Sequence, residues 1–145
     1  MKMEASTKLI SAIKRFEGLL CKTYLDCAGV PTIGFGHTQG VKMGMTITPE
    51  QAENYLYSDL RIVEDEVNGL NVCKTQGQFD ALCDFVFNLG FNKLKNSTLL
   101  RYIRIHKGNE AIQAQFRRWV YAGGAVQEGL VKRREWEAQR YVEED

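Results

Sequence analysis

Few folds can accommodate the segment between residues 18 and 48. It contains short β-type runs, at 23–25 and 32–35, which are separated by glycines and by a turn-like stretch at 26–31. Glycine and proline at such positions favour turns, so the pattern predicts two or three short antiparallel strands. Because so small a sheet is not stable alone, it must pack against other elements of the chain.

Amphipathic helices are predicted on both sides of this segment. A helical stripe of apolar residues precedes it, and Gly18 can end that helix. The sequence T-P-E-Q at 48–51 combines a capping hydroxyl, a first-turn proline and a glutamine three residues after the cap. The apolar stripe that follows predicts a helix over 49–68, which at about 30 Å is long enough to join two lobes.

The second half of the chain is predicted to be helical. Thr75 repeats the capping pattern, and the run that follows to Gly90 is apolar nearly all round. Such a helix is expected at the centre of a helical lobe. Further helices are expected near 97–107, 110–121 and 129–143.

The composition is ordinary for a soluble domain. The chain has 145 residues, long enough for one domain with its own core. Its 19 basic and 18 acidic residues give a net charge of +1, which disfavours nucleic-acid binding. No apolar run approaches the roughly 20 residues of a membrane span, and residues 1–8 lack the apolar stretch of a secretory signal. We therefore expect no nucleic-acid partner, no stable membrane anchor and synthesis into the cytoplasm.

The four cysteines, at 21, 27, 73 and 83, do not suggest a metal site. None of them forms a C-x-x-C pair, which is the usual spacing of zinc ligands. We expect reduced thiols that serve as small core residues, with a Cys21–Cys27 or a Cys73–Cys83 disulfide as the alternative. Nothing in the sequence suggests a metal ion or an organic cofactor.

Two carboxylates and a hydroxyl in this region are candidates for acid–base chemistry. Glu17 lies at the predicted C-terminal end of a helix, where the helix dipole and an apolar junction disfavour the charged form, as a general acid requires. Asp26 lies at a strand tip, where we expect it to be more exposed and ionised. Thr32 begins the returning strand, so its hydroxyl comes back toward Asp26. The set suits glycoside hydrolysis by single displacement, although on spacing alone the two acids could be surface charges.

The stretch from Glu17 to His37 reads E-G-x(5)-Y-x-D-x(2)-G-x(2)-T-I-G-x-G-H. It resembles the active-site segment of phage-type lysozymes, glycoside hydrolase family 24. Similar segments follow along nearly the whole chain: M-T-I-T at 45–48, D-A-L at 80–82, F-N-L-G at 87–90, S-T-L-L-R at 97–101, R-W-V-Y-A-G-G at 118–124 and G-L-V-K-R-R at 129–134. The resemblance implies an α+β, lysozyme-like fold that is mostly helical.

The resemblance also implies roles for the three candidate residues. Glu17 would donate a proton to the glycosidic oxygen, and Asp26 would position or activate the attacking water. Thr32 would hold that water on the far face of the sugar. The usual outcome in the family is inversion at the anomeric carbon, which needs a wide gap between the two carboxyl groups.

Five further residues are expected around this site. The resemblance implies that Arg133 approaches and steadies Glu17, with Arg134 as the near-equal alternative. His37 is expected to be structural and tied to an acid of the long helix. Phe87 and Asn88 would line the wall of the cleft; the alternative is an ordinary core phenylalanine and a helix-end asparagine.

The resemblance implies one lysozyme domain over 1–145. A small sheet lobe would span about 18–60, and a helical lobe would take 1–17 and 70–145. The substrate would be peptidoglycan, cleaved at the β-1,4 bond from N-acetylmuramic acid to N-acetylglucosamine by a monomer that needs a holin for release to the periplasmic wall. A non-catalytic peptidoglycan-binding module and a lytic transglycosylase are the alternatives.

Overall fold

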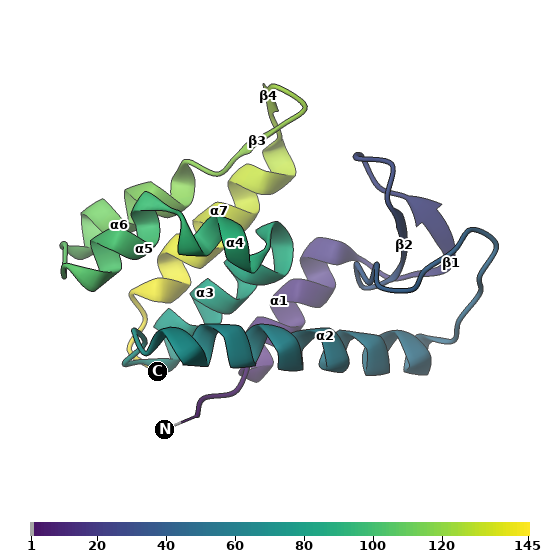
Figure 1. Ribbon diagram of the computed structural model, residues 1–145, viewed down its shortest axis with the longest axis horizontal. Helices are drawn as coiled ribbons and strands as arrows, with labels where there is room; N and C mark the ends of the chain where they lie inside the picture. The colour runs from purple at the N-terminus through teal and green to yellow at the C-terminus, as the bar shows by residue number, and fades with distance from the viewer. Residues whose placement is uncertain (1) are drawn as a thin grey trace.

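The computed structural model describes residues 2–145 as seven helices and two small antiparallel sheets (Figure 1). The first half of the chain holds α1 (Thr7–Glu17), β1 (Leu20–Leu25), β2 (Pro31–Gly34) and α2 (Pro49–Leu70). The second half holds α3 (Gln76–Leu89), α4 (Phe91–Lys95), α5 (Thr98–Arg104), α6 (Asn109–Arg117), β3 (Tyr121–Ala122), β4 (Ala125–Val126) and α7 (Glu128–Tyr141). The predicted α+β class, mostly helical with a small sheet, is confirmed.

The long helix α2 begins where the sequence predicts it. The Thr48 hydroxyl accepts a hydrogen bond from the Gln51 backbone N–H (3.1 Å), and the Gln51 side chain accepts one from the Thr48 backbone N–H (2.9 Å). These bonds satisfy donors that a helix N-terminus leaves without partners. The helix runs two residues beyond the predicted stop and ends before Asn71, which takes the left-handed conformation.

The sheet of β1 and β2 lies against one end of α2, and α3 also packs on this helix (Figure 1). The two strands pair antiparallel, with Tyr24 opposite Thr32. Gly34 of β2 packs so closely on α2 that a Cβ atom there would lie 3.2 Å from the Cβ of Ala52. This contact supplies the packing surface that so small a sheet needs.

Helix α3 is the centre of the helical part, as its apolar sequence predicts. It packs against α1, α2, α4 and α7. Two of its fully buried residues are nevertheless carboxylates, Asp80 and Asp84. Each meets an arginine of α7: Arg140 lies 2.8 Å from Asp80, and Arg133 lies 2.8 Å from Asp84. The interface between α3 and α7 therefore contains buried ion pairs within an apolar core.

The helix predicted near 110–121 is present as α6, but it ends before the predicted position. Helix α6 ends at Arg117, and β3 and β4 form a hairpin around Gly123 and Gly124. Both glycines have positive φ, +61° and +80°, which is the backbone that a tight hairpin turn requires. The short helix α4 was also not predicted, because five residues carry too little apolar periodicity.

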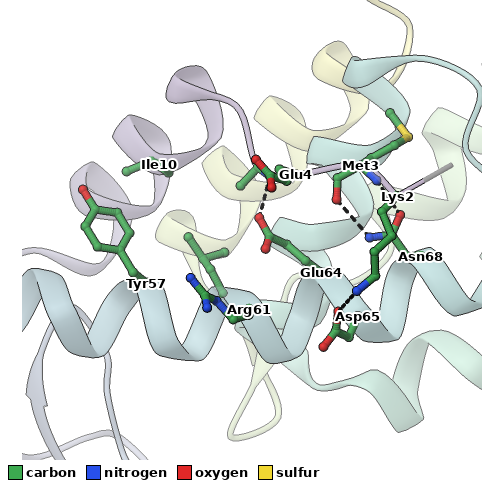
Figure 2. A pocket seen from close by; sticks show the side chains of 11 residues that line it. Lys2, Met3, Glu4, Ile10, Tyr57, Arg61, Glu64, Asp65 and Asn68 are labelled. Atoms are coloured by element: carbon green, nitrogen blue, oxygen red, sulfur yellow. Dashed lines mark hydrogen bonds and ion pairs between the residues drawn. The ribbon is translucent and has the colours of Figure 1, made fainter.

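Met3 and Ala5 are held along the C-terminal part of α2 (Figure 2). Asn68 binds Met3 twice, accepting from its backbone N–H and donating to its carbonyl, both at 2.9 Å. Glu64 accepts from the Ala5 N–H at 2.6 Å. These hydrogen bonds lie beside a surface pocket, and none of the predicted site residues lines that pocket. No helix within residues 2–145 is long and apolar enough to cross a membrane.

Two glycine substitutions test how tightly α3 packs on α7. A Cβ atom at Gly77 would lie 2.5 Å from the Glu143 carbonyl oxygen and closer still to that of Arg140, whereas Gly69 of α2 has open space around it. We expect Gly77→Ala to lower the free energy of unfolding by about 1 to 3 kcal/mol, since backbone must move to admit it. Gly69→Ala should raise it by about 0.4 to 1 kcal/mol. Urea unfolding measures both, and equal effects would contradict this packing.

Candidate active site

Glu17 is the last residue of α1 and lies where that helix ends beside the sheet (Figure 1). Its side chain is 19% exposed. Oε2 accepts a hydrogen bond from Arg133 Nη1 at 2.6 Å. On the other side, a Cβ atom at Gly36 would lie 2.5 Å from Oε1. The carboxyl group is therefore held between an arginine of α7 and the backbone of the loop after β2.

Arg133 joins three helices at this point. Its Nε and Nη2 donate to the two oxygens of Asp84 on α3, at 3.0 and 2.8 Å, while Nη1 serves Glu17 on α1. The guanidinium also lies over the ring of Phe16, 5.2 Å from its centroid. Of the two arginines considered from the sequence, Arg133 is thus the one that contacts Glu17.

In the buried ion pair of Arg133 and Asp84, each group stabilises the charged form of the other. Burial alone would raise the pKa of Asp84, but the charge of Arg133 and the hydrogen bonds from Glu137 and Arg133 bring it below its ordinary value. Burial opposes the charge on Arg133, and Asp84 and Glu17 more than compensate, so its pKa is raised. Both groups are therefore charged at neutral pH.

Arg134 faces a different set of partners. Its Nη2 donates to the side-chain oxygen of Asn88 and to Glu137 Oε2, both at 2.8 Å. Asn88 is thereby fixed by a bond within the protein and keeps its amide N–H groups for other partners. Phe87, half-buried, lines a small hollow together with Gly36 of the loop after β2. The structure thus places Phe87 and Asn88 at the end of α3 near the sheet.

Asp26 and Thr32 lie on either side of the turn between β1 and β2. Asp26 Oδ1 accepts from the backbone N–H groups of Ala28 and Val30, at 2.9 and 2.8 Å. Its Oδ2 makes no hydrogen bond within residues 2–145. Thr32 is buried and donates its hydroxyl proton to the Val30 carbonyl at 2.8 Å. Asp26 is half-buried like Glu17, so two backbone N–H groups, rather than exposure, compensate its charge.

Tyr24 of β1 lies between Glu17 and Asp26 in the sequence and is not among the predicted site residues. The pKa of its phenol is raised by burial first and then by the charges of Glu17 and Asp26. The charges of both carboxylates therefore raise the pKa of this one side chain. The available signal was the tyrosine in the E-G-x(5)-Y-x-D motif.

His37 lies beside the long helix and not among the carboxylates of the hairpin. Its Nδ1 is 2.8 Å and 3.1 Å from the two oxygens of Asp59 on α2. Its ring stacks on Tyr55 of the same helix at a centroid distance of 4.3 Å. These contacts tie the loop after β2, which carries Gly36, to α2.

The four thiols are free, and they differ in exposure. Cys27 is exposed beside Asp26, and Cys21 is partly buried. Burial, followed by the charge of Asp80, raises the pKa of Cys73 to about 12, and burial raises that of Cys83 well above its ordinary value. Within residues 2–145, no group of three or more His, Cys, Asp or Glu side chains could hold a metal ion.

Comparison with known proteins identifies the relatives of this chain. The model of the phage lysozyme family matches residues 14–137. The endolysin of Salmonella phage P22 is 41% identical over 127 residues, which cover 83% of this chain and 86% of that protein. The endolysin of Acyrthosiphon pisum secondary endosymbiont phage 1 is 39% identical over 93% of this chain and 95% of its own length. The solved endolysin from Escherichia coli O157:H7 phage FAHEc1 superposes with a TM-score of 0.81 at 37% identity, covering 98% of this chain and 95% of that one.

A glycine pair tests the close contact between Gly36 and Glu17. Gly36 and Gly40 have nearly the same φ, +74° and +72°, but only Gly36 has a neighbour within 4 Å. Gly40→Ala should lower the free energy of unfolding by about 1 to 2 kcal/mol, because alanine is strained in the left-handed backbone conformation. Gly36→Ala should lower it by about 1 to 3 kcal/mol more, because its Cβ atom would also displace the Glu17 carboxyl group. Thermal or urea unfolding gives both values; equal losses would show that the Glu17 side chain moves aside freely.

Proposed function

The chain belongs to the phage lysozyme family and has a lysozyme-type glycosidase function, and from this premise we propose the bond it cleaves and how. The proposed reaction is hydrolysis of the β-1,4 bond between N-acetylmuramic acid and N-acetylglucosamine in peptidoglycan. In this reaction Glu17 is the general acid, and Asp26 and Thr32 together orient the attacking water.

One observation carries the proposal: each carboxylate is held by hydrogen bonds, Glu17 by Arg133 and Asp26 by two backbone N–H groups of the hairpin turn. Glu17 lies at the end of a helix and Asp26 at the end of a hairpin, so the two carboxylates belong to different secondary-structure elements. Such a pair, with a hydroxyl beside the second carboxylate, is what single-displacement glycoside hydrolysis needs.

In the proposed mechanism Glu17 gives its proton to the glycosidic oxygen as the bond breaks. The carboxylate that remains is stabilised by Arg133, whose Nη1 is already bonded to Oε2. Because Arg133 is fixed by Asp84, this stabilisation needs no reorganisation during the reaction. After the reaction, solvent returns a proton to Glu17.

The water would be held by two acceptors. Thr32 gives its own hydroxyl proton to the Val30 carbonyl, so its oxygen is left to accept from water. Asp26 Oδ2 is the second acceptor, since Oδ1 is taken by backbone N–H groups. A water that donates one hydrogen to each turns its lone pair outward, toward the anomeric carbon. As this water attacks from the side opposite to Glu17, it passes a proton to Asp26 Oδ2 and the configuration is inverted. Asp26 later releases that proton to solvent.

We propose that the polysaccharide lies between the sheet and the helical part, with Phe87 and Asn88 on one wall. On this view the sheet lobe and the helical lobe form one domain whose cleft is the site. The enzyme would work as a monomer. As an endolysin it would depend on a holin to reach the wall from the cytoplasm, where it would be made.

Two other readings predict different products. A lytic transglycosylase uses one acid and leaves an anhydro end, so Asp26 and Thr32 would have no role. A non-catalytic binding module would release nothing. The bonds that fix Asp26 and Thr32 in place favour hydrolysis over both.

The first test compares Glu17→Gln with the wild type and with Glu144→Gln, an exposed control. We expect Glu17→Gln to slow the clearing of outer-membrane-permeabilised Gram-negative cells by about 100-fold or more, because the proton donor is lost. Glu144→Gln should clear at the wild-type rate. Mass spectrometry of the released muropeptides should show muramic-acid reducing ends.

The products decide between the readings. Anhydro ends would assign the protein to the transglycosylases, and a folded wild type that releases no muropeptides would be a binding module. Full activity in Glu17→Gln would remove Glu17 from the mechanism.

A second test separates the Thr32 hydroxyl from its volume. Thr32→Val keeps the shape but loses the acceptor for water, and we expect clearing to slow by about 10- to 100-fold. Thr32→Ser keeps the hydroxyl and should retain most of the activity. If the valine variant is as active as the serine variant, Thr32 does not hold the water.

A further inference from the structure

A second pocket, in the helical part of the molecule, is lined by basic side chains. It has a volume of about 480 Å³ and lies between the α2–α3 connection, the end of α5 and the start of α6, away from the β1–β2 sheet (Figure 1). Lys74, Arg104, His106 and Lys107 line it, and within residues 2–145 no Asp or Glu does. None of the predicted site residues lines it, so this basic pocket is separate from the candidate active site.

The charge of the basic pocket does not follow from the composition of the chain. With 19 basic and 18 acidic residues, a pocket of average composition would carry almost no net charge. The pocket in Figure 2 is of that kind, because Lys2 and Arg61 line it together with Glu4, Glu64 and Asp65. The basic pocket is therefore a local concentration of positive charge.

The cations of the basic pocket are not neutralised by carboxylates. In the part of the chain that the structure describes, Lys74, Arg104 and Lys107 make no ion pair. Lys107 Nζ lies 5.2 Å from the centroid of the Tyr102 ring, a contact that leaves its charge in place. Like charges that line one pocket repel one another, so an anion between them is attracted and also relieves that repulsion.

The backbone at the end of α5 places most of these basic groups. The Ile103 carbonyl accepts from the His106 N–H at 3.1 Å, and the Tyr102 carbonyl accepts from the Lys107 N–H at 3.0 Å. With His106 in the left-handed conformation (φ +57°), these bonds end the helix in a tight turn. Three of the basic groups thus belong to one fixed helix end, and Lys74 reaches the same pocket from a separate segment.

The rest of the pocket wall suits an anion that carries an organic substituent. The apolar side chains of Ile103, Ile112 and Tyr141 are buried and line the pocket. Helix α6 begins there at Asn109, and its N-cap residue, Gly108, has no side chain to cap the first N–H groups of the helix. Those N–H groups add donors to the cations.

We propose that this pocket binds a phosphate group. Cations from separate segments suit a tetrahedral anion with two charges, which accepts hydrogen bonds from several directions. A carboxylate has two oxygens, which a single arginine can satisfy. Two sources supply such a group, the headgroup of an anionic phospholipid and a soluble phosphate ester. The site does not depend on the hydrolysis proposed above.

The first arm of the test is a titration of the full chain with inorganic phosphate, followed by backbone amide NMR at constant ionic strength. We expect saturable shifts at millimolar phosphate in the N–H signals of Lys107, Gly108 and Asn109. The wild type alone can overturn the proposal in this arm. It is overturned if these signals do not move, or if they move no more than those of basic residues elsewhere on the surface.

The second arm separates the pocket from the overall charge. The double variant Lys74→Gln, Arg104→Gln should bind phosphate at least about tenfold more weakly, because it loses two charged donors. The matched control Lys93→Gln, Lys95→Gln loses the same charge from α4, which does not line the pocket, and should bind as the wild type does. Equal weakening in both double variants would overturn the proposal, since only net charge would then matter.

Vesicle sedimentation distinguishes the two sources of phosphate. Binding to phosphatidylglycerol vesicles but not to phosphatidylcholine vesicles, lost in the pocket double variant and kept in the control, assigns the site to a lipid headgroup. Phosphate binding without vesicle binding assigns it to a soluble phosphate ester. Cleavage of purified peptidoglycan should be equally fast in the wild type and the pocket double variant, so failure of the proposed hydrolysis would leave the binding results intact.

Discussion

The position of the candidate acid, Glu17, depends on one buried guanidinium, that of Arg133. It connects α1, α3 and α7 by binding Glu17 with one nitrogen and Asp84 with the other two. Removing charges from water is costly, so such a cluster is stable only when each charge is paired and each hydrogen bond is made. The core therefore fixes the candidate acid, although the arginine is 116 residues away along the chain.

The other half of the site is built from local backbone. The turn between β1 and β2 orients Asp26 through two N–H groups and Thr32 through the Val30 carbonyl. This hairpin gains its stability by packing on α2, and the His37–Asp59 contact ties the following loop to the same helix. The long helix thus holds the locally built hairpin and the loop that follows it.

The same division explains how much the sequence could predict. Helix starts such as Thr48, and the hairpin with Asp26 and Thr32, depend on neighbours in the sequence and were predictable. The contact of Arg133 with Glu17 came from the family resemblance and not from spacing. Asp84 and Glu137 could not be found, because a carboxylate in a helix is normally exposed and only the fold brings arginines to it. The β3–β4 hairpin was missed because strands of two residues carry no alternating pattern, so the segment between the predicted helices gave no strand signal.

A double-mutant cycle on the clearing rate across Asp84 and Arg133 tests the central claim most directly. If Asp84 acts by holding Arg133 on Glu17, then Asp84→Asn should cost nothing further once Arg133→Met has removed the guanidinium. The double variant should clear cells as fast as Arg133→Met alone, and it should be more stable, since it leaves no unpaired buried charge. If the double variant instead clears cells more slowly than Arg133→Met, by the factor that Asp84→Asn shows alone, the two residues act independently and this account is contradicted.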